Sequence, residues 1–281
     1  MKNFKMLVYD IGAHQGEDTE YYLERGFNVI AFECMPENIR IIQERFHQEL
    51  STRQLILETR AVLSGGGKGN IAEFFVDENS VWGTLHRKWA ERNLRLGSKN
   101  KVISVETMDP KQIFKDYGKP YFIKIDIEGE DINVLQALAT LDISDRPRYV
   151  SIESSKTSWR SLISEFKVFE ELGYKRYAVV AQSKMPGTTS KWISNNGNVK
   201  SYNHQMHSSG PFGEDLSKSC WISKKQAVQR YRLIFFWYWL FGDDGIFAPR
   251  KIKNTYLRRK FSRMLNRFRM KDWYDTHAKM Y

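Results

Sequence analysis

The chain has 281 residues, and 41% of them are hydrophobic, which is enough for one large domain with a buried core and excludes global disorder. Its net charge of +11 is unevenly spread, because residues 250–281 hold eleven Lys and Arg against two Asp, a charge of +9 that leaves +2 for the rest. A nearly neutral body argues against nucleic-acid binding over the whole surface.

Short apolar runs alternate with helix-length segments through the first two thirds of the chain. The predicted strands are Met6–Tyr9, Asn28–Phe32, Leu55–Leu57, Ile71–Val76, Val102–Val105, Tyr121–Ile127, Tyr149–Ile152 and Tyr174–Val180. The predicted helices are Glu17–Arg25, Pro36–His47, Asp131–Leu141 and Trp159–Leu172. Strands separated by helices predict βαβ units, and therefore an α/β fold with a mostly parallel sheet and helices on both faces.

The last hundred residues lose this alternation. Residues 181–211 are polar and rich in Ser, Asn and Gly, with one strand expected near Ser201–Met206. We expect three parts: a main domain over 1–181, an irregular region completing it over 182–229, and a helical, aromatic and basic C-terminal extension over 230–281.

The extension has two unusual segments. Tyr231–Phe241 is strongly aromatic but shorter than the roughly 20 residues that a bilayer-spanning helix needs, so we expect it to pack on the domain, pack on a second copy in a homo-oligomer, or dip into a membrane surface. Apolar residues from Ile252 to Phe268 recur at helical spacing among Lys and Arg. Such a helix suits docking on the domain, an anionic membrane surface, an acidic partner or nucleic acid, and the neighbouring aromatic run favours membrane over RNA.

Two further features indicate where the protein works. Cys34 and Cys220 lie far apart and match no disulfide or metal pattern, as in reduced cytosolic proteins. A strand that begins at Met6 leaves no room for a signal peptide. We therefore expect a cytoplasmic protein, with peripheral contact at the inner face of a membrane as an option through residues 230–271.

The segment Asp10–Thr19 (DIGAHQGEDT) lies between a strand and a helix, where open α/β sheets bind ligands. Gly12 and Gly16 let the backbone bend tightly around Ala13 and approach a ligand closely. Asp10 stands where a dinucleotide-binding GxGxxG motif has its first glycine, and a carboxylate there would repel a pyrophosphate. It would attract a cation, which favours S-adenosylmethionine (SAM), with its sulfonium and ammonium groups, over NAD.

Glu33 follows the next predicted strand, where an acidic residue can accept hydrogen bonds from both ribose hydroxyls. This role suits NAD and SAM equally. The alternative is that the glycines make an ordinary tight turn and that Glu33 lies on the surface near the helix that Pro36 begins.

The segment Lys124–Asp131 (KIDIEGED) places four carboxylates at the end of a buried strand and the start of a helix. Asp126 and Glu128 are candidates to bind or deprotonate a substrate hydroxyl. They are also candidate ligands of a divalent cation, although no complete ligand set is present, and we predict no metal site. The last two acidic residues of the segment have a simpler role as helix caps.

Three segments together resemble the FkbM family of SAM-dependent methyltransferases: DIGAHQGEDT, AFECMPEN and KIDIEGEDINVLQAL. The resemblance covers roughly residues 8–180 and implies a Rossmann-like class I methyltransferase fold with a mostly seven-stranded sheet. It also implies O-methylation of a hydroxyl on a sugar, glycan or natural product. By position, Asp10, Gly12 and Gly16 would bind SAM and Glu33 would hold its ribose.

Other candidates concern the acceptor. His14 stands where many members of the family have asparagine, and it is either a general base or, more simply, a hydrogen-bonding residue of the turn. Glu153, at the end of a later strand, is a second candidate for contacting the acceptor, or a surface partner of a nearby cation. Residues 79–93 interrupt the sheet pattern, so Trp82, His86 and Arg87 either wall an acceptor pocket or pack at the surface.

Two functions compete with methyl transfer. An NAD-dependent oxidoreductase has the same strand-terminal acid but needs the glycine motif that Asp10 interrupts. A non-catalytic protein that binds membrane or RNA would rely on the basic extension instead.

Overall fold

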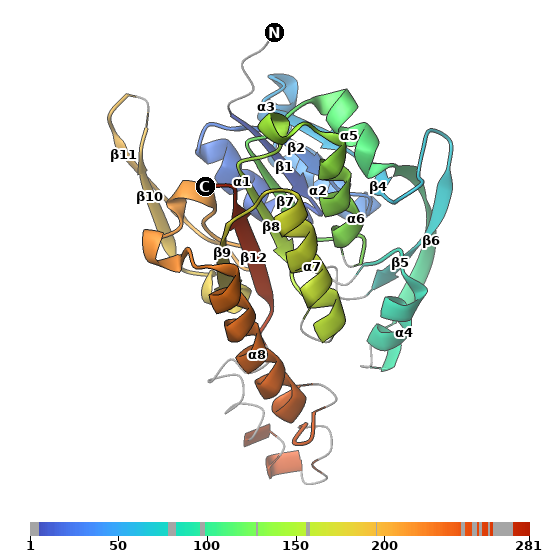
Figure 1. Cartoon of the computed structure of the whole chain (residues 1–281). Coiled ribbons are helices and arrows are strands. Elements are labelled where there is room, and N and C mark those ends of the chain that lie inside the picture. The colour runs from blue at the N-terminus through green and yellow to red at the C-terminus, as the bar shows by residue number, and fades with distance from the viewer. Residues whose placement is uncertain are drawn as a thin grey trace.

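The computed structural model describes residues 6–77, 83–95, 99–127, 129–155, 158–194, 196–242, 245–248, 252, 255–257, 259–260 and 272–281. Its centre is a seven-stranded sheet of order β3-β2-β1-β7-β8-β12-β9 (Figure 1). The strands are β1 (Leu7–Ile11), β2 (Asn28–Phe32), β3 (Leu55–Glu58), β7 (Phe122–Ile125), β8 (Tyr149–Glu153), β9 (Arg176–Ala181) and β12 (Tyr274–Lys279). The pairs of β1, β2, β3, β7 and β8 are parallel, and only β12 pairs antiparallel with both of its neighbours in the sheet. The predicted mostly parallel seven-stranded sheet is confirmed.

Helices cover both faces of this sheet. They are α1 (Glu17–Glu24), α2 (Pro36–Arg45), α3 (His47–Ser51), α5 (Pro110–Tyr117), α6 (Asp131–Ala137), α7 (Trp159–Glu171) and α8 (Lys224–Phe241). Successive residues of β1 belong to different hydrophobic clusters, one on each face of the sheet. Tyr9 packs in the cluster that includes Phe166 of α7, and Val8 packs in the cluster that includes Tyr22 of α1. Strands covered on both faces are nearly continuously apolar, which is why their sequences predicted them well.

Two smaller units flank the central sheet. One is a three-stranded sheet of β4 (Ala61–Val62), β6 (Asn100–Met108) and β5 (Ile71–Asp77), beside α4 (Arg87–Arg95). The other is the hairpin of β10 (Thr189–Ile193) and β11 (Val199–Asn203). The strand expected near Ser201–Met206 is therefore β11, which begins two residues earlier and lies outside the central sheet.

The end of the chain departs from the predicted helical extension. Tyr274–Lys279 form β12, inserted between β8 and β9, and Asp275, Thr276 and His277 are buried there. The sequence YDTHAK is too polar to predict a buried strand, so the prediction of helix through residue 281 is wrong at its end. α8 begins before residue 230, at a capping box made by Ser223, and most of the amphipathic helix expected near Ile252–Phe268 lies outside the described residues.

α8 has the length of a membrane span but not the composition. Among the described residues, no helix is both long and apolar enough to cross a bilayer.

Candidate functional site

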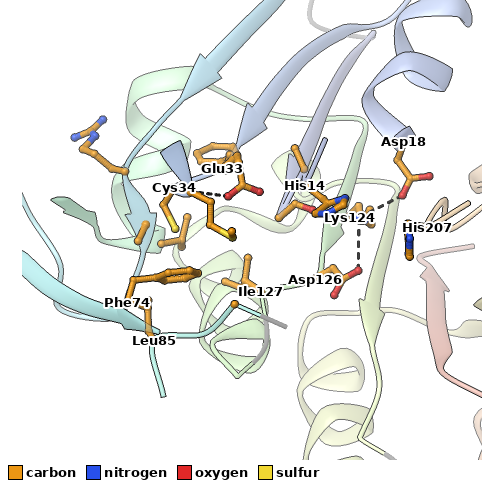
Figure 2. A pocket seen from close by; sticks show the side chains of 18 of the residues that line it. His14, Asp18, Glu33, Cys34, Phe74, Leu85, Lys124, Asp126, Ile127 and His207 are labelled. Carbon is orange, nitrogen blue, oxygen red and sulfur yellow. Dashed lines mark hydrogen bonds and ion pairs between the residues drawn. The ribbon is translucent and has the colours of Figure 1, made fainter. Parts of the chain in front are cut away.

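A cleft with about 870 Å³ of space opens at the carboxyl ends of β1, β2 and β7 (Figure 2). The β1–α1 turn contributes Gly12, Ala13 and His14, and β2 and β7 contribute Glu33 and Asp126 at their ends. The sequence thus predicted five residues that the structure brings to one place. Carboxyl ends of parallel strands meet at one edge of a sheet, where ligands of open α/β folds bind.

The first turn of the cleft depends on Gly12. Its φ is +87°, and a Cβ added there would lie 1.9 Å from the carbonyl oxygen of Asp126. The backbone N–H groups of Gly12 and Ala13 both donate to the carbonyl oxygen of Phe32, at 3.0 Å. Glycine is therefore required for the turn to lie against the neighbouring strands.

Gly16 and Asp10 lie behind the cleft and do not line it. Gly16 has a φ of +85°, and a Cβ there would lie 2.5 Å from the ring of Phe46, so its role is helix packing. Asp10 is fully buried, and its Oδ2 accepts a hydrogen bond of 2.6 Å from Thr19 Oγ1. Burial raises the pKa of Asp10 to about 6, although nearby Lys124 opposes the rise.

Lys124 is the centre of the charged end of the cleft. Its Nζ lies 3.3 Å from Asp18 and 3.6 Å from Asp126 (Figure 2). It also lies 3.6 Å from the buried Asp10. Burial alone would lower the pKa of Lys124, but these carboxylates outweigh it and hold the pKa well above its ordinary value. One ammonium faces three carboxylates, so this end of the cleft favours a positively charged ligand.

Neither Lys124 nor Asp18 was assigned a role from the sequence. A single lysine inside the apolar strand YFIKI is a usable signal, because a lysine is almost never buried without partners. Asp18 also accepts hydrogen bonds from Ser208 Oγ at 2.7 Å and from Ser209 N at 2.9 Å. These contacts tie α1 to the segment after β11, which no local pattern indicated.

Glu33 marks the other end of the cleft. Its Oε1 accepts a hydrogen bond of 2.8 Å from the backbone N–H of Met35. Burial raises the pKa of Glu33, and the Met35 N–H opposes that rise. Figure 2 shows Phe74 and Leu85, which belong to an apolar wall, on the side of Glu33 opposite the charged end around Lys124. A carboxylate next to an apolar wall suits a ribose attached to a flat base.

The candidate proton acceptors lie at the charged end. Asp126 lines the cleft, and 27% of its side chain is exposed. His14 has a φ of +51°, and its Nδ1 is 2.9 Å from Glu17 Oε1. The ring of His207, which the sequence did not single out, lies 5.8 Å from the His14 ring, edge to face. Glu128 lies outside the described residues.

Glu153 lines a neighbouring cleft with about 930 Å³ of space, together with Trp89, Glu165 and Trp273. Ser154, Ser155, Ser161 and Ser164 add hydroxyl groups to it. Burial raises the pKa of Glu165 to about 8, and the backbone N–H of Ser155 opposes the rise. This second cleft is therefore rich in hydroxyl groups and aromatic surface.

The segment expected to wall a pocket contributes to both clefts, through Gly83 and Leu85 in the first and Trp89 in the second. His86 pairs with Glu130, with 2.9 Å between Nε2 and Oε1, and the hydrogen bond to Glu130 raises the pKa of His86. Arg87 is exposed, and Trp82 lies outside the described residues.

The described residues contain no group of three or more His, Cys, Asp or Glu side chains that could hold a metal ion.

Comparison with known proteins points to one family. The model of the methyltransferase FkbM domain matches residues 10–176. No curated protein matches the chain.

Solved structures show only distant likeness. A precorrin-6y C5,15-methyltransferase from Geobacter metallireducens GS-15 is 13% identical over 70% of this chain and 75% of its own, with a TM-score of 0.35. A precorrin 8w decarboxylase from Methanobacterium thermoautotrophicum is 10% identical over 70% and 76%, also at 0.35. A StiE O-MT segment is 9% identical over 97% and 67%, at 0.38. The order of the seven strands itself identifies the fold.

Proposed function

Because the chain belongs to the FkbM methyltransferase family, we propose that the first cleft binds SAM and that the enzyme methylates a hydroxyl oxygen. The observation that carries this proposal is the division of the cleft. Glu33 and an apolar wall lie at one end, and an excess of carboxylates around Lys124 lies at the other. A nucleoside with a cationic tail fits this division.

At the nucleoside end, Glu33 would accept hydrogen bonds from the ribose hydroxyls, and Phe74 and Leu85 would cover the adenine. At the other end, Asp18 and Asp126 would attract the cationic groups. SAM supplies, when bound, an electrophilic methyl group on a positively charged sulfur. The same carboxylates count against NAD, because they would repel a pyrophosphate.

The residues of the chain must then position the acceptor oxygen and remove its proton. Alignment of the oxygen with the methyl group and exclusion of water both accelerate such a transfer. Asp126 and His14 are the candidates to take the proton, because both line the first cleft.

We propose the second cleft, around Glu153 and Glu165, as the route or site for the acceptor. Its serine hydroxyls, carboxyls and two tryptophans support a sugar, a glycan or a similar hydroxyl-rich natural product. Tryptophan faces and hydroxyl groups together suit polyhydroxylated rings, which have both apolar faces and polar edges.

The test is a calorimetric titration of the full chain with SAM, S-adenosylhomocysteine and NAD in parallel. We expect SAM and its product to bind in the micromolar range and NAD not to bind. Transfer is then followed by mass spectrometry with isotopically labelled SAM and a set of sugar and glycan acceptors. NAD binding would overturn the proposal in favour of an NAD-dependent oxidoreductase. The absence of SAM and NAD binding by well-folded protein would overturn it and leave a non-catalytic role.

A further inference from the structure

The second half of α8 presents an unusually apolar surface. Its large exposed side chains continue into the short segments that follow the helix, and together they form what we call the aromatic surface: Leu233, Phe236, Trp237, Trp239, Ile246 and Phe247. Their exposed fractions lie between 41% for Trp237 and 63% for Leu233. Exposed apolar patches of this kind mark interaction sites in soluble proteins.

The first half of α8 is different, because it belongs to the core. Ala227 and Tyr231 are fully buried, and the Tyr231 hydroxyl lies 2.6 Å from Thr276 Oγ1 of β12. One helix therefore holds the domain at one end and exposes aromatic side chains at the other. The rigid attachment means that the aromatic surface has a defined direction relative to the sheet.

That direction is toward the edge of the sheet with the two clefts. The ring of Phe235 contacts Trp159, the first residue of α7, with 5.2 Å between ring centroids. Since α7 follows the carboxyl end of β8, Phe235 lies near this edge, and the rest of α8 extends about 9 Å further at 1.5 Å per residue. Figure 1 shows the C-terminal end of α8 projecting beyond the sheet on that side.

Cations follow the aromatic surface along the sequence. Residues 250–271 contain ten Lys and Arg and no Asp or Glu. Among the described residues of this segment, Arg259 and Lys260 are exposed, and so are Tyr256 and Leu257. Aromatic side chains enter the interface between lipid headgroups and acyl chains, and cations are attracted to anionic headgroups.

We propose that the aromatic surface, together with the exposed Arg259 and Lys260 that follow it in the sequence, docks the protein on an anionic lipid bilayer, with the clefts facing the lipid. A nucleic acid would match the cations but not the exposed Leu233, Ile246 and Phe247. Resting on the proposed function, this orientation selects acceptors held at a membrane surface, in which the hydroxyl-bearing group is attached to a lipid.

The test is co-sedimentation of the full chain with vesicles, either of phosphatidylcholine alone or of phosphatidylcholine mixed with phosphatidylglycerol. We expect binding to the anionic vesicles, weakened by salt, and little binding to the neutral ones. The double variant Phe236→Ser and Trp239→Ser should weaken binding at least about tenfold, because two large apolar side chains would no longer enter the bilayer. Arg259→Glu with Lys260→Glu should weaken binding to anionic vesicles as well.

The matched control is Ile193→Ser with Val199→Ser. These residues of the β10–β11 hairpin are each 73% exposed. The control therefore removes two exposed apolar side chains from a different part of the surface. Equal loss in the control and in the Phe236 and Trp239 variant would overturn the proposal. So would binding to a single-stranded RNA oligonucleotide without binding to vesicles.

Vesicle binding does not require SAM, so the two proposals fail separately. Docking without SAM binding would remove only the methyl transfer. SAM binding without docking would remove only the membrane surface.

Discussion

Replacing Glu33 tests the nucleoside end of the cleft most directly. One of its oxygens, Oε1, already accepts the backbone N–H of Met35 at 2.8 Å. In Glu33→Gln, the amide oxygen can keep that contact, while the NH2 group replaces the second carboxylate oxygen and cannot accept from a ribose hydroxyl. The substitution therefore removes the charged acceptor for the ribose hydroxyl and leaves the local hydrogen bond in place.

The expected loss follows from the charge of the acceptor. A hydrogen bond to a charged group contributes about 1.5–3 kcal/mol, which corresponds to an increase of about 10- to 150-fold in the Kd for SAM. Calorimetric titration of Glu33→Gln and of wild type measures this factor. Glu37→Gln is the matched control, because Glu37 is an exposed residue of the adjacent helix α2 and should leave the Kd unchanged.

A ligand that lacks the ribose 2′-hydroxyl separates direct contact from indirect effects. Wild type should lose affinity for the 2′-deoxy analogue of S-adenosylhomocysteine, and Glu33→Gln should lose much less. If the variant binds SAM as well as wild type does, or loses the same factor with the deoxy analogue, Glu33 does not hold the ribose. Since burial raises the pKa of Glu33, wild-type affinity should also begin to fall at a higher pH than for an ordinary glutamate as the solution is acidified.

Three further outcomes are expected. Gly12→Ala should lower the free energy of unfolding, measured by urea denaturation, by more than Gly26→Ala does. Both glycines have a positive φ, but only at position 12 would the added Cβ meet the backbone, at 1.9 Å. Equal losses in the two variants would contradict this. Lys124→Met should cost about 3–5 kcal/mol of stability by leaving buried carboxylates without their cation. A loss no larger than that of an exposed-lysine control such as Lys191→Met would refute this role. Burial raises the pKa of Asp275 to about 8, and the charge of Asp126 adds to this rise. The protonated Asp275 therefore stabilises the fold fully below about pH 3.9, and this contribution is lost as the pH rises to about 8. Asp275→Asn should therefore gain stability relative to wild type between pH 5 and pH 8, and an unchanged difference would show that Asp275 is ionised throughout.

Much of the first cleft was predictable from the sequence, because its residues lie within or directly after strands with a strong local pattern. β1, β2 and β7 are short, apolar and bounded by turn residues, so their ends could be located along the chain. Parallel strands then bring Gly12, Glu33 and Asp126 to one edge by topology alone. Their positions needed no knowledge of distant contacts.

Residues that act through distant parts of the chain were not predictable in this way. Asp18 meets Ser208 and Ser209 across 190 residues, and His207 reaches the cleft from a polar region without periodicity. β12 has no apolar alternation, and it becomes a strand because β8 and β9 leave a gap whose backbone groups must be paired.

The predictable and the unpredictable features differ in the sequence range of the interactions that determine their structure. Glycine conformation, strand periodicity and helix caps act within a few residues, and they establish the βα turn around Gly12 and the strand before Glu33 from sequence alone. The carboxylates around Lys124, the buried Asp275 and the direction of the aromatic surface depend on which segments pack together. Most of those contacts join residues about a hundred positions apart, and only the folded chain brings them together.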